Sequence, residues 1–344
     1  MLLRPTESGI WCEAGGFHLD PWRPVDRAVI SHAHSDHARA GCRAYLCAAR
    51  GEGVLRERIG LDAPIETLAW GERREIGGVA VSLHPAGHVL GAAQIRVEHR
   101  GEVWVFSGDY KRAPDPTADE FEPVACHTFI TESTFGLPIY RWQEPEEIFA
   151  AMNTWWRGNA GEGRTSVISA YALGKAQRVL AGVDASIGPI AVHGAVARFL
   201  PRYAAAGVVL PEVVGGDADG AKRVRGVGLV IAPESAIGSP WIRKFGEVST
   251  AAASGWMKVR AARRRAALDR GFALSDHADW PALLRTIAET GAQRVLATHG
   301  YTAPLTRYLR ERGIDAGVLP TRYEGERGEA EADEAAPTAE EAGA

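Results

Sequence analysis

The sequence is poor in cysteine, in long apolar runs and in net charge. Its four cysteines include no Cys-x-x-Cys pair, so we expect neither a disulfide scaffold nor a thiolate zinc knuckle. We expect the four cysteines to be buried, reduced thiols. No segment approaches the roughly 18–20 consecutive apolar residues that a membrane helix requires. Residues 1–16 show no basic segment followed by an apolar core, so we expect no secretion signal and a cytoplasmic location.

The small net charge of the chain, −4, is unevenly distributed. Residues 324–344 contain eight acidic residues and one arginine, so residues 1–323 carry +3. The acidic segment is rich in Ala, Glu and Gly and has no aromatic residue, which predicts a disordered tail. The mildly basic remainder is compatible with a polyanionic substrate.

Apolar patterning predicts an α/β protein. Strands are predicted at 28–31, 79–84, 92–98, 102–107, 129–131, 166–169, 189–192, 228–231 and 294–297. Helices are predicted at 144–158, 173–185, 281–290 and 303–312. Helices that alternate with short apolar strands are typical of a parallel sheet, so the middle of the chain is expected to form a second α/β unit inserted into the first.

Four candidate metal ligands lie within six residues of one loop, directly after the first of these strands. They are His32, His34, Asp36 and His37. Imidazole and carboxylate groups suit Zn²⁺, Mn²⁺ or Fe²⁺, and a loop that leaves a strand can aim several of them at one point. A His-x-His pair alone would not separate a catalytic metal site from two simpler alternatives. These are a surface loop that binds no metal and a purely structural zinc site.

Further candidate ligands occur at the ends of other predicted strands. His88 lies between Gly87 and Gly91, which predict a close approach of the backbone to a metal, and Asp109 ends a Ser-Gly-Asp segment. Asp20 precedes the histidine loop by about the length of a hairpin. The repeated placement at strand ends makes a metal site the favoured interpretation.

The order and context of these residues resemble the metallo-β-lactamase superfamily, an αββα sandwich that holds two metal ions. The resemblance implies that the first ion is bound by His32, His34 and His88, and that Asp36 and His37 bind the second. Two divalent ions about 3.5–4 Å apart lower the pKa of a water that they share and clamp the attacking and leaving oxygens of a phosphodiester. The implied reaction is attack of this metal-bound hydroxide on the phosphodiester.

By the same resemblance, Asp109 bridges both ions, and Asp20 hydrogen-bonds a ligand histidine to fix its tautomer. The implied cofactors are two divalent ions, Mn²⁺ or Zn²⁺, because the ligand set has no thiolate. Asp36 and Asp109 are therefore predicted to be both metal ligands and catalytic residues.

Three later motifs, at 131–136, 275–279 and 298–300, resemble motifs A, B and C of the β-CASP nucleases. Segment 169–177 resembles the turn that leads into a helix of the inserted β-CASP domain. The resemblance implies that His299 completes the second metal site. It implies that His277, hydrogen-bonded to Glu132, contacts the scissile phosphate and protonates the leaving oxygen.

Simpler interpretations are a helix-capping or salt-bridging role for Glu132, a helix-capping segment around His277, and a core histidine at His299.

These resemblances imply a domain order along the chain. A metallo-β-lactamase domain occupies 1–137 and continues at 271–323, a β-CASP domain is inserted at 138–270, and the acidic tail is 324–344.

Over residues 1–323 the chain resembles the bacterial ligase-associated DNA exonuclease (metallophosphoesterase) family, with matching phrases at 20–22, 31–37 and 272–280. The resemblance implies a DNA-repair nuclease that favours single strands, with an ATP-dependent DNA ligase and a helicase as partners and no membrane. Exonuclease and endonuclease modes both remain open. DNA-specialised β-CASP enzymes usually lack the histidine of motif C, so His299 keeps an RNA-processing enzyme, similar to RNase J or the mRNA 3′-end endonuclease, as the alternative.

Two other classes are disfavoured. A catalytically dead scaffold is disfavoured because every motif position carries a competent side chain, and a small-molecule hydrolase because a domain is inserted.

A basic cluster before His277 is the predicted nucleic-acid contact. Its members are Lys258, Arg260, Arg263, Arg264 and Arg265. Such a cluster can track a phosphate backbone, although a solvated helix face has the same composition. Tyr110, Lys111 and Arg112 are placed by their proximity to Asp109 in the sequence to contact substrate.

Overall fold

The structure is a computed structural model that describes residues 1–259 and 268–323. Within them the chain forms two compact units, the first made of residues 1–141 and 277–323 and the second of residues 142–259 and 268–276. No helix in the described ranges is both long and apolar enough to cross a membrane. Four members of the basic cluster, Arg260, Arg263, Arg264 and Arg265, and the predicted tail at 324–344 lie outside the described residues.

The first unit begins with a six-stranded sheet whose strands follow one another in chain order. The strands are β1 (Leu3–Pro5), β2 (Ile10–Cys12), β3 (Phe17–Leu19), β4 (Ala28–Val29), β5 (Tyr45–Ala48) and β6 (Ile65–Leu68). The first three pair antiparallel, and β3 to β6 pair parallel. A short 3₁₀ turn, η1 (Ala49–Gly51), and helix α1 (Glu52–Ile59) follow β5.

The second sheet of this unit has seven strands in the order β19-β18-β11-β10-β9-β8-β7. They are β7 (Arg73–Ile76), β8 (Val79–Pro85), β9 (Ala93–His99), β10 (Glu102–Phe106), β11 (Thr128–Ser133), β18 (Arg294–Gly300) and β19 (Asp315–Val318). Strands β7 to β10 pair antiparallel, and β10, β11, β18 and β19 pair parallel. Arg100 and Gly101 join β9 to β10 with φ of 49° and 81°, the left-handed pair typical of a tight hairpin.

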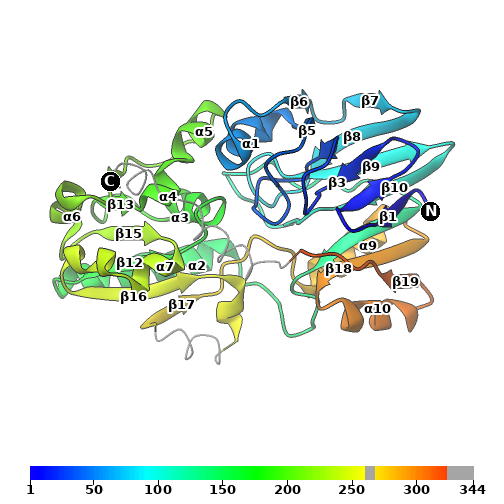
Figure 1. The fold of residues 1–344 in the computed structure, drawn as a ribbon. Helices are drawn as coiled ribbons and strands as arrows, with labels where there is room; N and C mark the ends of the chain where they lie inside the picture. The colour runs from blue at the N-terminus through cyan, green and yellow to red at the C-terminus, as the bar shows by residue number, and fades with distance from the viewer. Residues whose placement is uncertain (260–267, 324–344) are drawn as a thin grey trace. The chain divides into compact units, whose positions relative to one another are not determined.

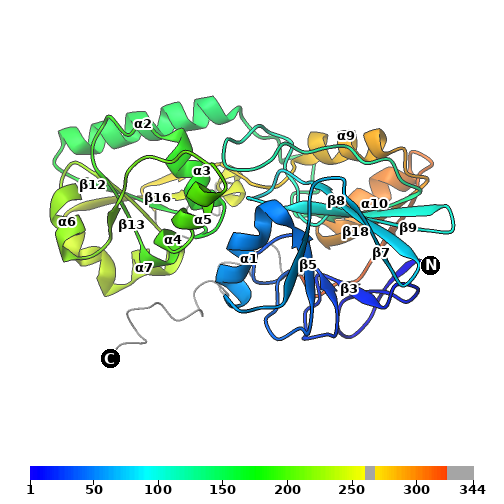
Figure 2. The same cartoon turned by 90° about the horizontal axis from the view of Figure 1, so that it is seen from above.

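Alternation along β10 explains how the second sheet is covered on both faces. Trp104 and Phe106 belong to a core shared with the first sheet, whereas Val105 points the other way, as the two-residue period of a strand requires. On that other face lie α9 (Trp280–Thr290) and α10 (Thr302–Arg310), whose apolar side chains pack against Val105 in one cluster. Figure 2 shows α9 on the side of this sheet away from β3 and β5.

The second unit is built on a six-stranded sheet in which every described pair of strands is parallel. Its order is β14-β13-β15-β12-β16-β17, visible in part in Figure 1. The strands are β12 (Thr165–Ser169), β13 (Ile190–Val192), β14 (Val214–Gly215), β15 (Leu229–Ala232), β16 (Val248–Ala253) and β17 (Arg270–Phe272).

Helices cover both faces of this parallel sheet, and α2 and α7 lie on opposite sides of it in Figure 2. The described helices are α2 (Pro145–Gly161), α3 (Lys175–Gly182), α4 (Gly194–Ala197), α5 (Leu200–Ala205), α6 (Ala218–Val224) and α7 (Glu234–Gly238), with 3₁₀ turns η2 (Pro240–Phe245) and η3 (Gly255–Lys258). Coverage on both faces explains why β12 and β15 are buried throughout and read as continuous apolar or small-residue runs.

The predicted α/β class is confirmed, and each predicted strand overlaps an observed one. The helix predicted at 173–185 is shorter in the structure, because Gly174 has a φ of 92° before the first helical residue and Val183 is extended after the last. All four cysteines are free and buried, as expected for reduced thiols.

Candidate metal centre

Three of the predicted site residues are brought together by parallel strand pairing. Strand β10 pairs with β11, and β11 pairs with β18. Because the carboxyl ends of parallel strands lie at one edge of a sheet, Asp109 just after β10, Glu132 in β11 and His299 in β18 meet at the same edge. These residues are far apart in the sequence and close in the fold.

The histidine loop reaches this edge from the other sheet. The backbone N–H of Ala93, the first residue of β9, donates to the carbonyl of Ser31 at 2.8 Å. Since β9 begins opposite the end of β10, this bond draws the loop after β4 toward Asp109. Gly108, at a φ of 55°, lies close enough that an added Cβ would be 2.7 Å from the side chain of Ser31.

His32, His34 and His88 form the first group of candidate ligands. Their ring centroids are 4.8–4.9 Å apart. Nε2 of His88 lies 3.0 Å from Nδ1 of His34, and one ligand atom from each residue falls within 4.8 Å of the others. All three side chains are buried. Three imidazoles at this spacing can surround a single cation.

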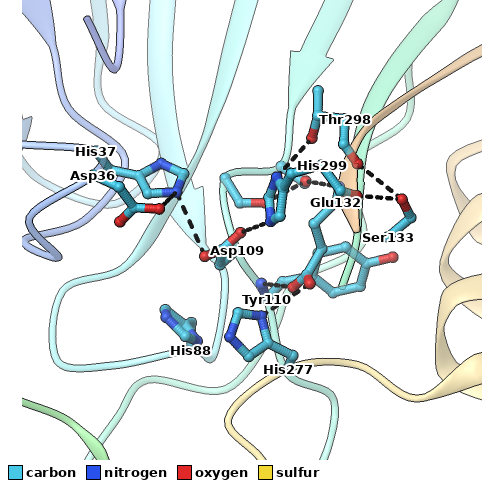
Figure 3. Close-up of polar contacts among 12 residues, drawn as sticks. Asp36, His37, His88, Asp109, Tyr110, Glu132, Ser133, His277, Thr298 and His299 are labelled. Carbon is cyan, nitrogen blue, oxygen red and sulfur yellow. Dashed lines mark hydrogen bonds and ion pairs between the residues drawn. The ribbon is translucent and has the colours of Figure 1, made fainter. Parts of the chain in front are cut away.

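The second group surrounds Asp109, which Figure 3 shows between Asp36 and His37 on one side and His299 on the other. One carboxylate oxygen, Oδ2, is 3.5 Å from Nε2 of His37 and 3.7 Å from Nε2 of His32. The other, Oδ1, is 3.1 Å from Nε2 of His299. Asp36 adds an oxygen 3.6 Å from Nε2 of His37. Asp109 is therefore the residue that faces both groups.

Buried atoms in this region lack the partners that burial normally requires. Nε2 of His32, Nε2 of His37 and both oxygens of Asp36 and of Asp109 have no hydrogen-bond partner among the described residues. Unsatisfied buried polar groups are costly, and imidazole and carboxylate are the donors that Mn²⁺ and Zn²⁺ accept. The residues present therefore fit two divalent cations.

Asp20 holds a ring nitrogen of one of these histidines directly and that of another through Ser31. Its Oδ2 lies 2.7 Å from Nδ1 of His37, and it also accepts from the hydroxyl of Ser31. The oxygen of that hydroxyl lies 2.9 Å from Nδ1 of His32. With Nδ1 of each ring held in this way, Nε2 is the nitrogen left to bind metal. The hydrogen bond predicted between Asp20 and a ligand histidine is present in the structure.

Glu132 and His277 form a buried pair beside the candidate ligands. Nδ1 of His277 is 2.9 Å from Oε2 of Glu132, and the backbone N–H of Tyr110 donates to Oε1 at 2.7 Å. The ring of His277 lies 4.7 Å from that of His88, and a nitrogen of His277 belongs to a possible ligand group with Asp109. The structure thus brings the predicted pair to the centre, as Figure 3 shows.

Burial and neighbouring charges shift the pKa values of His32 in the first group and His37 in the second in opposite directions. Burial and the surrounding histidines hold the pKa of His32 well below its usual value. Burial also lowers the pKa of His37, but the carboxylates of Asp36, Asp109 and Asp20 outweigh it and raise the pKa to about 10. Burial raises the pKa of Asp109, and His299 and His37 reverse this and hold it well below the usual range. In the metal-free protein, the imidazole of His37 is therefore protonated on both nitrogens and carries a positive charge at neutral pH.

Two of the residues expected to contact substrate are buried. Tyr110 is fully buried, with its carbonyl accepting from the N–H of Ala278 at 2.7 Å. Lys111 is 2% exposed and donates to the carbonyl of His88 at 3.2 Å and to Asp115 at 2.5 Å. Their proximity to Asp109 in the sequence therefore serves the packing of the centre. Both side chains are held within the fold, and their contact with substrate stays a prediction.

The glycines beside His88 lie against other backbone segments. A Cβ on Gly87 would lie 2.3 Å from the carbonyl oxygen of Lys111, and one on Gly91 would lie 2.1 Å from Gly51. These glycines let backbone approach backbone, which fixes the loop that carries His88. The predicted close approach of this backbone to a metal stays a prediction.

Several supporting residues were not predicted from the sequence. The hydroxyls of Ser31 and Thr298 lie 2.9 and 3.2 Å from Nδ1 of the histidine that follows each, so a hydroxyl residue directly before a ligand histidine was a usable signal. Tyr323, the last described residue, stacks on His37, and nothing in its sequence context indicated this.

The predicted nucleic-acid contacts stay a prediction. Lys258 is exposed at the end of η3 in the second unit. The arginines of the cluster lie outside the described residues, as stated above.

Comparison with known proteins gives partial matches. No protein-family model matches the chain. A protein of Opitutus terrae named "Probable DNA ligase" is 31% identical over 314 residues, which are 90% of this chain and 30% of that protein. Cleavage and polyadenylation specificity factor 73 of Drosophila melanogaster is 34% identical over 185 residues, 49% of this chain and 27% of that protein. Endoribonuclease YSH1 of Kluyveromyces lactis is 31% identical over 124 residues, 35% of this chain and 16% of that protein.

The chain thus spans less than a third of the length of each of these relatives. Among solved structures, a protein of unknown function from Enterococcus faecalis V583 has a TM-score of 0.59 over 87% of this chain and 80% of its own, at 12% identity, a likeness of fold alone. An endoribonuclease among the relatives is consistent with a metal-dependent hydrolase. Together with the gathered histidines and aspartates, these relatives support the assignment of the chain to the metallo-β-lactamase superfamily and its β-CASP group.

Proposed function

We propose that this protein is a nuclease that hydrolyses phosphodiester bonds with two divalent metal ions, and that its substrate is DNA, single-stranded DNA in particular, in DNA repair. The observation that carries the proposal is the position of Asp109. Its carboxylate lies 3.7 Å from Nε2 of His32 in the first group, and 3.5 and 3.1 Å from Nε2 of His37 and of His299 in the second, so it would serve as a ligand to both ions.

In this proposal the ions are held by the two groups of ligands described above and, when bound, supply Lewis-acid activation of water and of the phosphodiester. Asp20 keeps Nδ1 of His37 occupied, so that Nε2 stays directed at the centre. Asp109, fully buried and three residues after the end of β10, would hold the two groups at a set spacing.

His277 is proposed to hold the proton that the leaving oxygen requires. Glu132 accepts from Nδ1 of His277 and is itself held by the N–H of Tyr110, so the pair fixes the orientation of the imidazole. Nε2 can then donate its proton to the 3′ oxygen as the phosphodiester is cut. The products would be a 5′ phosphate and a 3′ hydroxyl.

Support for DNA comes from the extent of similarity. The relative named "Probable DNA ligase" matches 90% of this chain, whereas the factor and the endoribonuclease match 49% and 35%. A link with an ATP-dependent DNA ligase is part of the same proposal, as is the helicase partner. The competing candidate is an RNA-processing nuclease, which the endoribonuclease relative and the histidine at position 299 favour.

The test uses one single-stranded sequence made as DNA and as RNA, end-labelled and incubated with the purified chain and Mn²⁺ or Zn²⁺. We expect metal-dependent cleavage of the DNA at a rate at least tenfold above that of the RNA. The Asp109→Asn variant serves as the inactive control for contaminating nucleases. Faster cleavage of the RNA would replace the DNA proposal by the RNA-processing one, and cleavage of neither would refute both.

A further inference from the structure

Tyr323 lies against the second group of candidate ligands although it is about 290 residues from the histidine loop in the sequence. Its ring stacks on the imidazole of His37, with centroids 4.3 Å apart and planes 16° apart. It meets the ring of His299 edge-on, at 5.9 Å and 88°. One aromatic side chain therefore touches two of the candidate ligands of the second ion.

The hydroxyl of the same residue is tied to Asp20. It donates to the backbone carbonyl of Asp20 at 2.9 Å. Asp20 has a φ of 37°, a left-handed conformation that costs a non-glycine residue energy and persists only where neighbours hold it. The carboxylate of Asp20 in turn lies 2.7 Å from Nδ1 of His37. Tyr323 thus contacts His37 directly through its ring and indirectly through Asp20.

Packing holds Tyr323 firmly in this place. The side chain is only 6% exposed and belongs to the core between the two sheets. Trp22 meets its ring edge-on at 5.7 Å. Leu319, just after β19, donates from its N–H to the carbonyl of Ala297 in β18 at 2.9 Å, which guides the chain from β19 back toward the centre.

We infer that Tyr323 is a positioning residue for the second metal ion. It restrains the ring plane of His37 and the backbone of Asp20, so that Nε2 of His37 is aimed at Asp36 and Asp109 before an ion binds. This inference rests on the proposed metal centre but not on the choice of substrate. Residues that orient ligands in this way typically contribute about 10–100-fold to metal affinity.

The test measures Mn²⁺ binding without nucleic acid, by calorimetry and by electron paramagnetic resonance of the free ion. Tyr323→Leu is placed in two backgrounds, His34→Ala, which keeps the second group of ligands, and His299→Ala, which keeps the first group. We expect Tyr323→Leu to weaken binding at least tenfold in the His34→Ala background and by less than twofold in the His299→Ala background. Tyr323→Phe, which keeps the ring and removes the hydroxyl, should give an intermediate loss.

Tyr203→Leu is the matched control, because Tyr203 is also a buried tyrosine but lies in the other unit. It should lower the melting temperature and leave Mn²⁺ affinity unchanged in both backgrounds. Equal losses in the two backgrounds, no loss in either, or a wild-type chain that binds fewer than two ions would overturn the inference. A wild-type chain that binds two ions and cleaves neither DNA nor RNA would defeat the proposed function and leave this inference intact.

Discussion

Nδ1 of His277 lies 2.9 Å from Oε2 of Glu132, and both side chains are buried. The second oxygen of Glu132 accepts from the backbone N–H of Tyr110, which fixes the direction of the carboxylate. The pair orients the imidazole, and the proposed centre assigns neither residue as a metal ligand. We therefore expect proton transfer and metal binding to be separable by mutation.

Replacing His277 by Ala should lower kcat by about 10²–10⁴-fold, the usual contribution of a general acid, while the metal content stays at two ions. Glu132→Gln should also lower kcat, because the imidazole loses the carboxylate that orients it. Single-turnover rates and metal analysis of the same samples separate the two effects. Loss of metal in step with activity would contradict the proton-transfer role.

Replacing Asp109 by Asn should remove detectable cleavage, because both groups of ligands lose the carboxylate that lies between them. Bound metal, measured by mass spectrometry after dialysis, should fall below two ions per chain. Asp315→Asn is a suitable control, since that carboxylate is 71% exposed at the surface of the same unit. Wild-type turnover in Asp109→Asn would exclude a shared-ligand role.

Binding of the second ion should release protons. The pKa of His37 is raised to about 10 in the metal-free protein by Asp36, Asp109 and Asp20, against the effect of burial, so its imidazole is protonated at neutral pH. A cation must displace that proton, and its affinity should rise with pH by up to about tenfold per unit until the pH reaches about 10. The pKa of His32 is held low, so binding at the first group should depend less on pH. Calorimetry in buffers of different ionisation enthalpy measures the protons released, and an affinity that does not change with pH would contradict the expectation.

Lys111 and Asp115 form a buried ion pair beside the loop that carries His88. Lys111→Met leaves the carboxylate of Asp115 buried without its charged partner, which should lower the free energy of unfolding by about 3–5 kcal/mol. The double variant Lys111→Met, Asp115→Leu should regain part of that loss, since it removes both charges. Urea denaturation of the metal-free proteins measures the difference. A single variant as stable as wild type would show that the pair does not hold this loop.

Much of the candidate site was predictable because its residues are grouped locally. The loop that carries His32, His34, Asp36 and His37 follows a short apolar strand, and both features are visible in a window of ten residues. The tight turn before β10 is equally local, because only Arg100 and Gly101 determine it. Patterns of this kind depend on the period of apolar residues and on turn chemistry.

Other parts of the site were not predictable, because they depend on which strands pair. The amide of Tyr110 reaches Glu132 only because β10 lies beside β11. Tyr323 reaches His37 only because the chain turns back after β19, which pairs with β18. The backbone of Lys111 likewise approaches Gly87, and its side chain reaches the carbonyl of His88, only through the folded arrangement of these loops. No local pattern of residues indicated any of these contacts.

The sequence by itself determined the chemical types of the ligands and their order along the chain, because donor atoms and strand or loop propensity belong to individual residues and short segments. The tertiary structure decided which of these donors share one centre, since parallel pairing of β10, β11 and β18 places Asp109, Glu132 and His299 at one edge. It also decided which neighbours hold the donors in position, because packing and hydrogen bonds between distant segments form only when the two sheets close on a common core.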